Sequence, residues 1–214
     1  MQHDARLTVG LPAAVSAMTG VDAMVHAIEA YTSALKKNPL SDLLAREALR
    51  LLAANLDEVV HNGGNREARQ AMLLGSCLAG QAFANAPVAA VHALAYPLGG
   101  HFHIPHGLSN ALVLPHVLGF NGNAAAPLYA ELAPLVLGDQ LRAGSVLQQT
   151  EQFIGAMADF SVRSGLPTRL RDAGVPQDML PTLARDAMQQ QRLLVNNPRE
   201  MTEAHALAIY QVAY

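Results

Sequence analysis

Ser41-Asp-Leu-Leu-Ala-Arg-Glu-Ala-Leu-Arg-Leu-Leu52 decides the fold class, because its apolar residues recur at the three- and four-residue spacing of one helix face. The segment follows Asn38-Pro39, and its pattern continues to about Val60. The run His61-Asn-Gly-Gly-Asn65 then breaks it. The sequence therefore predicts an amphipathic helix from Ser41 to about Val60.

Similar signals extend outward on both sides of this helix. Within residues 12–35, Thr19 is expected to cap a helix whose first turn contains Asp22. The pairs Gly63-Gly64 and Gly99-Gly100 are interpreted as turns, and Asn121-Gly122-Asn123 is expected to end a helix. Further helices are expected near residues 66–86, 87–99, 105–118, 126–137, 144–164 and 176–190, with Thr202 capping the last one.

The chain shows no alternating strand pattern of any length, no internal repeat and no low-complexity tract. Alanine and leucine are abundant, while β-branched residues are few. These features favour an all-α helical bundle. Because the loops are short and lack linker composition, residues 1–214 are expected to form a single helical domain.

The composition indicates which kinds of binding partner are expected. The 214 residues are 51% hydrophobic and 14% charged, and the formal net charge is -3. No basic stripe is present, so a nucleic-acid partner is not expected. The few charges suggest that another copy of the chain, or a partner domain, covers part of the surface.

Localisation is also constrained. Cys77 is the only cysteine, which rules out an intrachain disulfide and favours a reducing compartment. The polar N-terminus shows no signal peptide, and no apolar run approaches the ~18 residues of a membrane span. A cytoplasmic protein without a membrane partner is expected.

The first chemical motif is Asp22 with His26. At a four-residue spacing on a helix, the carboxylate and the imidazole project from one face and can reach one cation. Such pairs also arise by chance, so the spacing alone does not establish a metal site.

The second motif is the stretch from Val91 to Gly107, which contains His92, His101, His103 and His106. His92 lies among alanines and leucines, where an imidazole needs a polar partner such as a backbone carbonyl. His106 follows a proline at an expected helix start, where a capping role is the simpler interpretation. One carboxylate with two or three imidazoles suits Fe(II), Zn(II), Ni(II) or Co(II).

Two long segments carry a family resemblance. Gly20-Val-Asp-Ala-Met-Val-His-Ala-Ile-Glu-Ala-Tyr31 and Ala90-Val-His-Ala-Leu-Ala-Tyr-Pro-Leu-Gly-Gly-His-Phe-His-Ile-Pro-His-Gly-Leu-Ser-Asn-Ala111 resemble the signatures of the iron-containing (group III) alcohol dehydrogenases. Asp4–Pro12 resembles the family's crossing between domains, and Asn197–Thr202 resembles its tail. The likeness covers essentially the whole chain.

The resemblance implies a helical bundle like the family's C-terminal domain, which is of the dehydroquinate synthase type. It also implies that Asp22, His26, His92 and His106 hold the metal, usually Fe(II) and sometimes Zn(II). In the family this metal polarises a small alcohol substrate while hydride passes to NAD(P).

Two departures from the family stand out. Many relatives carry a proton-relaying histidine where this chain has Tyr96, so Tyr96, His101 and His103 are the candidate proton-relay residues. The family's preceding nucleotide-binding domain, with its glycine-rich phosphate loop, is not found within residues 1–214. NAD(P) binding by this chain alone is therefore expected to fail, and a separate nucleotide-binding subunit or a homo-oligomer is the expected partner.

Two other functions stay open. The same Asp/His₃ cation could activate water and cleave esters or lactones, because a bound cation lowers the pKa of water. A serine-hydrolase route lacks its Gly-x-Ser-x-Gly motif, and Cys77 is interpreted as a packing residue. Alternatively, the chain is a non-catalytic helical module that a metal stabilises.

Overall fold

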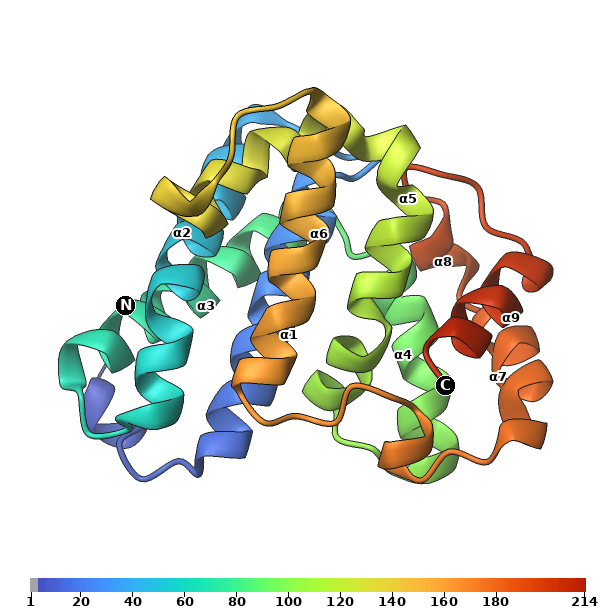
Figure 1. Ribbon diagram of the computed structural model, residues 1–214, viewed down its shortest axis with the longest axis horizontal. Helices are drawn as coiled ribbons and strands as arrows, with labels where there is room; N and C mark the ends of the chain where they lie inside the picture. The colour runs from blue at the N-terminus through green and yellow to red at the C-terminus, as the bar shows by residue number, and fades with distance from the viewer. Residues whose placement is uncertain (1–3) are drawn as a thin grey trace.

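The computed structural model describes residues 4–214, and its α-helices and short 3₁₀ turns form one bundle (Figure 1). The α-helices are α1 (Ala13–Tyr31), α2 (Pro39–His61), α3 (Arg66–Asn85), α4 (Ala90–Phe102), α5 (His106–Leu137), α6 (Val146–Arg163), α7 (Leu180–Ala187), α8 (Gln191–Leu194) and α9 (Glu203–Val212). The 3₁₀ turns are η1 (Ala5–Leu7), η2 (Gly138–Gln140), η3 (Arg171–Ala173) and η4 (Gln177–Met179). No strand occurs among the described residues, so the all-α prediction is confirmed.

Helix α1 is the central element. It packs against α2 and α3 on one side and against α5 on the other, while α5 also packs against α4 and α6. Figure 1 shows α7, α8 and α9 gathered at the far end of the bundle, beyond α4. The core is rich in alanine and leucine, and α1 contributes Ala17, Val21, Met24 and Ile28, each at most 1% exposed. This arrangement brings α1, α4 and α5 together around one point.

Local capping explains where several helices begin. Asn38 accepts a hydrogen bond from the Ser41 backbone N–H and is followed by Pro39, so α2 starts two residues earlier than predicted. Asn65 caps α3 in the same way. Thr202 caps α9, as predicted, and its backbone N–H donates to His205.

Three local predictions are wrong. Thr19 does not cap a helix: α1 already starts after Pro12, and the Thr19 hydroxyl donates to the Val15 carbonyl inside it. Gly99-Gly100 lies within α4, which continues to Phe102 and ends at His103 in the left-handed conformation, with φ of 54°. Helix α4 also begins at Ala90, later than the predicted 87.

The largest correction concerns α5. Asn121-Gly122-Asn123 does not end a helix, and one helix of 32 residues replaces the two predicted ones. The amides of Asn121 and Asn197 exchange hydrogen bonds of 2.9 and 2.8 Å, in a buried setting. Because this tertiary partner satisfies the Asn121 side chain, the side chain no longer competes with the helix backbone.

Within residues 4–214, no single helix is long and apolar enough to span a membrane; α3 and α4 reach the required composition only together and are bent by 106°.

Candidate metal centre

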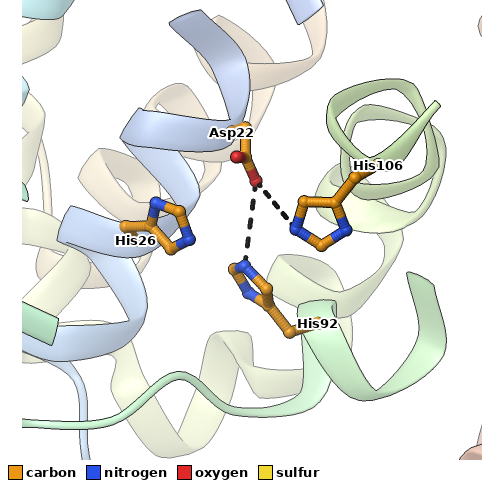
Figure 2. Close-up of side chains that lie close together, drawn as sticks. All are labelled: Asp22, His26, His92 and His106. Atoms are coloured by element: carbon orange, nitrogen blue, oxygen red, sulfur yellow. Dashed lines mark ion pairs between the residues drawn. The ribbon is translucent and has the colours of Figure 1, made fainter. Parts of the chain in front are cut away.

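Four predicted side chains meet between α1, α4 and α5 (Figure 2). Asp22 and His26 lie one turn apart on α1, His92 lies in the first turn of α4, and His106 is the first residue of α5. One ligand atom from each, an imidazole nitrogen or a carboxylate oxygen, lies within 4.8 Å of all the others. The structure therefore brings together one carboxylate and three imidazoles that are up to 84 positions apart in sequence, from 22 to 106.

Asp22 is the hub of the cluster. Its Oδ1 atom lies 3.4 Å from His106 Nε2 and 3.8 Å from His92 Nε2, the two contacts drawn as dashed lines in Figure 2. Both imidazoles thus present Nε2 to the same carboxylate oxygen.

A close approach of α5 to α1 positions His106. A Cβ atom on Gly107 would overlap the backbone carbonyl oxygen of Met18. Only glycine allows the start of α5 to lie this close to α1, and the neighbouring His106 side chain reaches Asp22 as a result.

Glu29 orients His92 through Nδ1, the ring nitrogen that does not face Asp22. This buried carboxylate accepts a 2.7 Å hydrogen bond from His92 Nδ1, and bonds of 2.8 and 2.7 Å from the backbone N–H groups of Ala89 and Val91. A proton on Nδ1 leaves Nε2 unprotonated, with its lone pair on the side of the cluster. The same contacts satisfy orphan donors at the start of α4, which explains why that helix begins at Ala90.

His26 is enclosed by rings. Its imidazole stacks on Phe83 and on His92, with both ring centroids 4.7 Å away. Burial is the main cause that lowers the pKa of His26 to about 4, while the nearby Asp22 carboxylate opposes the shift. His26 is therefore neutral near pH 7 and offers a lone pair rather than a charge.

Asn110 enters the cluster from α5. Its amide nitrogen donates to Asp22 Oδ1 at 2.5 Å and lies 3.2 Å from His106 Nε2 and 3.4 Å from His92 Nε2. Asn110 is fully buried.

The donor set fits a divalent metal. One carboxylate and three imidazoles match the borderline ligands that Fe(II) and Zn(II) take in proteins. The His92 side chain is 2% exposed, whereas those of Asp22 and His106 are 19% and 48% exposed. The cluster is therefore buried on the α4 side and open at His106, where a small molecule can approach.

The three candidate proton-relay residues lie in different places. The ring of Tyr96 is 6.0 Å from His106 and 6.4 Å from His92, centroid to centroid, at the edge of the cluster. His101 is instead paired with Asp186 on α7, with Nε2 2.7 Å from the carboxylate. His103 is an exposed residue that terminates α4. Only Tyr96 of these three lies against the four-residue cluster.

Sequence reasoning missed Glu29, Asn110 and Phe83. Glu29 lies three residues after His26, and Asn110 lies four residues after His106, so each shares a helix face with a candidate ligand. That spacing was a usable signal. Phe83 gave no such signal, because it lies on α3 and comes near His26 only when the helices pack together.

Comparison with known proteins relates most of the chain to one protein family. Residues 16–214 match the family described as "Fe-containing alcohol dehydrogenase family, C-terminal". Long-chain-alcohol dehydrogenase 1 of Geobacillus thermodenitrificans strain NG80-2 is 43% identical over 211 residues, which cover 99% of this chain and 53% of the relative.

Solved structures agree. The crystal structure of a 1,3-propanediol oxidoreductase matches with a TM-score of 0.94 and 41% identity, over 99% of this chain and 55% of that one. Sulfoacetaldehyde reductase from Bifidobacterium kashiwanohense, solved in complex with NAD+, matches with a TM-score of 0.85 and 29% identity, over 98% and 53%. The chain thus spans about half the length of the relatives it matches.

Proposed function

The chain belongs to the Fe-containing alcohol dehydrogenase family, and from that premise we propose that it forms the metal-binding helical part of an NAD(P)-linked enzyme that interconverts small alcohols and aldehydes. One observation carries the proposal: a carboxylate and three imidazoles from three helices, with ligand atoms within 4.8 Å of one another. The names of the relatives, an alcohol dehydrogenase and an aldehyde reductase among them, support the reaction class.

Asp22, His26, His92 and His106 would hold the metal. Fe(II) is proposed first, from the family, and Zn(II) second, because the same donors suit both ions. When bound, the metal supplies Lewis acidity, which favours loss of the proton from an alcohol oxygen. NAD(P)+ would supply the oxidant: its nicotinamide ring would accept the hydride of the alcohol carbon, while the proton of the hydroxyl group would leave through the protein.

The surrounding side chains prepare the ligands. Glu29 holds the proton on His92 Nδ1, and burial beside the stacked ring of Phe83 lowers the pKa of His26 and keeps it neutral. The exposed edge of His106 admits the substrate. Tyr96, against the same two imidazoles, is the proposed relay for the alcohol proton, with His101 and His103 as the more distant candidates.

The nucleotide is proposed to bind outside the 214 residues, because they contain no glycine-rich phosphate loop. A further domain or a separate nucleotide-binding subunit would supply it, and self-association would cover exposed apolar side chains such as Leu40 and Leu43. A cytoplasmic location is proposed from the single cysteine.

Metal analysis of the purified protein, repeated on Asp22→Ala and His106→Ala, tests the proposal. About one equivalent of metal is expected in the wild type and a marked loss in both variants. His61→Ala, at the exposed end of α2, is the matched control and should keep its metal. Unchanged metal content in Asp22→Ala and His106→Ala would remove the proposed site.

The same preparations distinguish the activities. NAD-dependent oxidation of primary alcohols is expected to be weak or absent with this chain alone and to appear when the nucleotide-binding part is added. Ester cleavage that a chelator abolishes, without alcohol oxidation under any condition, would instead favour a hydrolase.

A further inference from the structure

The Asn110 amide occupies an unusual position in the cluster. Its nitrogen lies within 3.4 Å of three candidate ligand atoms, one each on Asp22, His92 and His106. These atoms come from α1, α4 and α5, so a single amide group bridges all three helices that build the site. The NH₂ group has two hydrogens and can serve the carboxylate and one imidazole at a time.

The other end of the same amide has no partner. Asn110 Oδ1 is buried and accepts no hydrogen bond within residues 4–214. A buried acceptor without a donor destabilises a fold, and an apolar side chain of the same size would avoid this. Stability therefore does not explain an asparagine at this position, whereas its contact with Asp22 does.

We propose that Asn110 is the positioning residue of the metal centre: by donating to Asp22 Oδ1, it aims this carboxylate at the point where the imidazoles of His92 and His106 converge. Hydrogen bonds from neighbouring side chains commonly orient metal-binding carboxylates, and their loss weakens metal affinity. The inference rests on the proposed function, because it requires that Asp22 binds a metal.

Asn121 provides a matched control. It is a buried asparagine on the same helix, but both ends of its amide are satisfied by Asn197. At position 121, Asn→Leu removes both hydrogen bonds to Asn197. At position 110, the same substitution removes the bond to Asp22 together with a carbonyl oxygen that accepts none. The two variants separate a structural role from a positioning role.

The experiment measures Zn(II) and Co(II) affinity by titration of metal-free protein, together with its melting temperature. Asn110→Leu is expected to weaken both affinities about 10- to 100-fold without lowering the melting temperature of the metal-free protein. Asn121→Leu is expected to lower the melting temperature and to keep the affinity of the folded protein. Asn110→Ala, which adds no bulk, should repeat the loss of affinity if leucine fails to fold.

A double variant tests whether Asn110 acts on metal affinity through Asp22. When Asp22 is already replaced by alanine, Asn110→Leu should weaken Co(II) binding no further. Wild-type affinity in Asn110→Leu and Asn110→Ala, or an equal loss with and without Asp22, would overturn the role of Asn110 while leaving the metal site intact. Wild-type protein that binds neither ion would instead remove the proposed function, and this role with it.

Discussion

Glu29 Oε2 and His92 Nδ1 lie 2.7 Å apart, in a buried contact between the last turns of α1 and the first turn of α4. The contact orients His92, a candidate metal ligand. The same carboxylate also accepts hydrogen bonds from the backbone at the start of α4, the helix that carries His92.

Replacing Glu29 should therefore affect both metal affinity and stability. Glu29→Gln turns one acceptor oxygen into a donor, which faces either the Val91 N–H group or both the Ala89 N–H group and the His92 proton. We expect a loss of about 1–3 kcal/mol in the free energy of unfolding and about 10- to 100-fold weaker metal binding. Denaturant unfolding and Zn(II) titration measure the two effects. Glu47→Gln, on the exposed surface of α2, should change neither.

Gly107 tests the approach of α5 to α1. Gly107→Ala should push α5 away from the Met18 carbonyl, with a loss of about 1–3 kcal/mol in stability, and should move His106 away from Asp22. Gly119→Ala, on the same helix with no neighbouring atom within 4 Å, should instead raise stability by about 0.5–1 kcal/mol. Thermal unfolding and metal titration of both variants provide the comparison. Equal effects would refute a steric role for the close approach.

Substitutions of Tyr96 and His101 should have opposite effects on turnover if Tyr96 relays the alcohol proton. Tyr96→Phe removes the hydroxyl from the ring that lies nearest to His92 and His106 among the three candidates, and the turnover of the assembled dehydrogenase should fall about a hundredfold, with a changed pH profile. His101→Ala should leave turnover unchanged, because nine residues of helix place it about 13 Å along the axis from His92, where it pairs with Asp186. Steady-state kinetics across pH decides the matter. A large loss in His101→Ala alone would reverse the assignment.

Burial of Tyr129 and Tyr210 should make the free energy of unfolding fall at alkaline pH. Burial raises the pKa of Tyr129 and of Tyr210 above the ordinary value near 10, and Tyr210 also donates to the Leu94 carbonyl. Because the folded pKa exceeds the unfolded one, this stabilisation is complete below about pH 10 and declines above it, by about 1.4 kcal/mol per pH unit for each tyrosine. Tyr210→Phe should flatten the decline between pH 10 and 11.5 in urea unfolding. An equally steep decline in the variant would contradict the assignment.

Much of the fold follows from local sequence. The helix at Ser41–Val60 is confirmed because the amphipathic pattern and the flanking Asn38-Pro39 and Asn65 all act within a few residues. The grouping of Asp22, His26, His92 and His106 was expected from helical spacing together with the family resemblance, and the structure brings these side chains together.

The errors arise where distant contacts override local signals. Asn121-Gly122-Asn123 carries helix-ending signals, yet the Asn121 amide is satisfied by Asn197, 76 positions later in the chain, and α5 continues through it. Glu29 could be placed on the face of His26, but nothing local indicates that it reaches α4, 60 positions away at Ala89. The same limit applies to Asn110, whose partner Asp22 lies 88 positions earlier in the chain.

The Asn121–Asn197 amide pair has a consequence for the order of folding. The middle of α5 has a helix-breaking sequence, and the partner that satisfies it is separated by 76 positions of chain. During folding, the two halves of α5 are therefore expected to form early as independent segments, since local contacts form faster than distant ones. We expect them to join into one continuous helix only when the loop that carries Asn197 docks, so that a late tertiary contact completes the longest helix of the described residues.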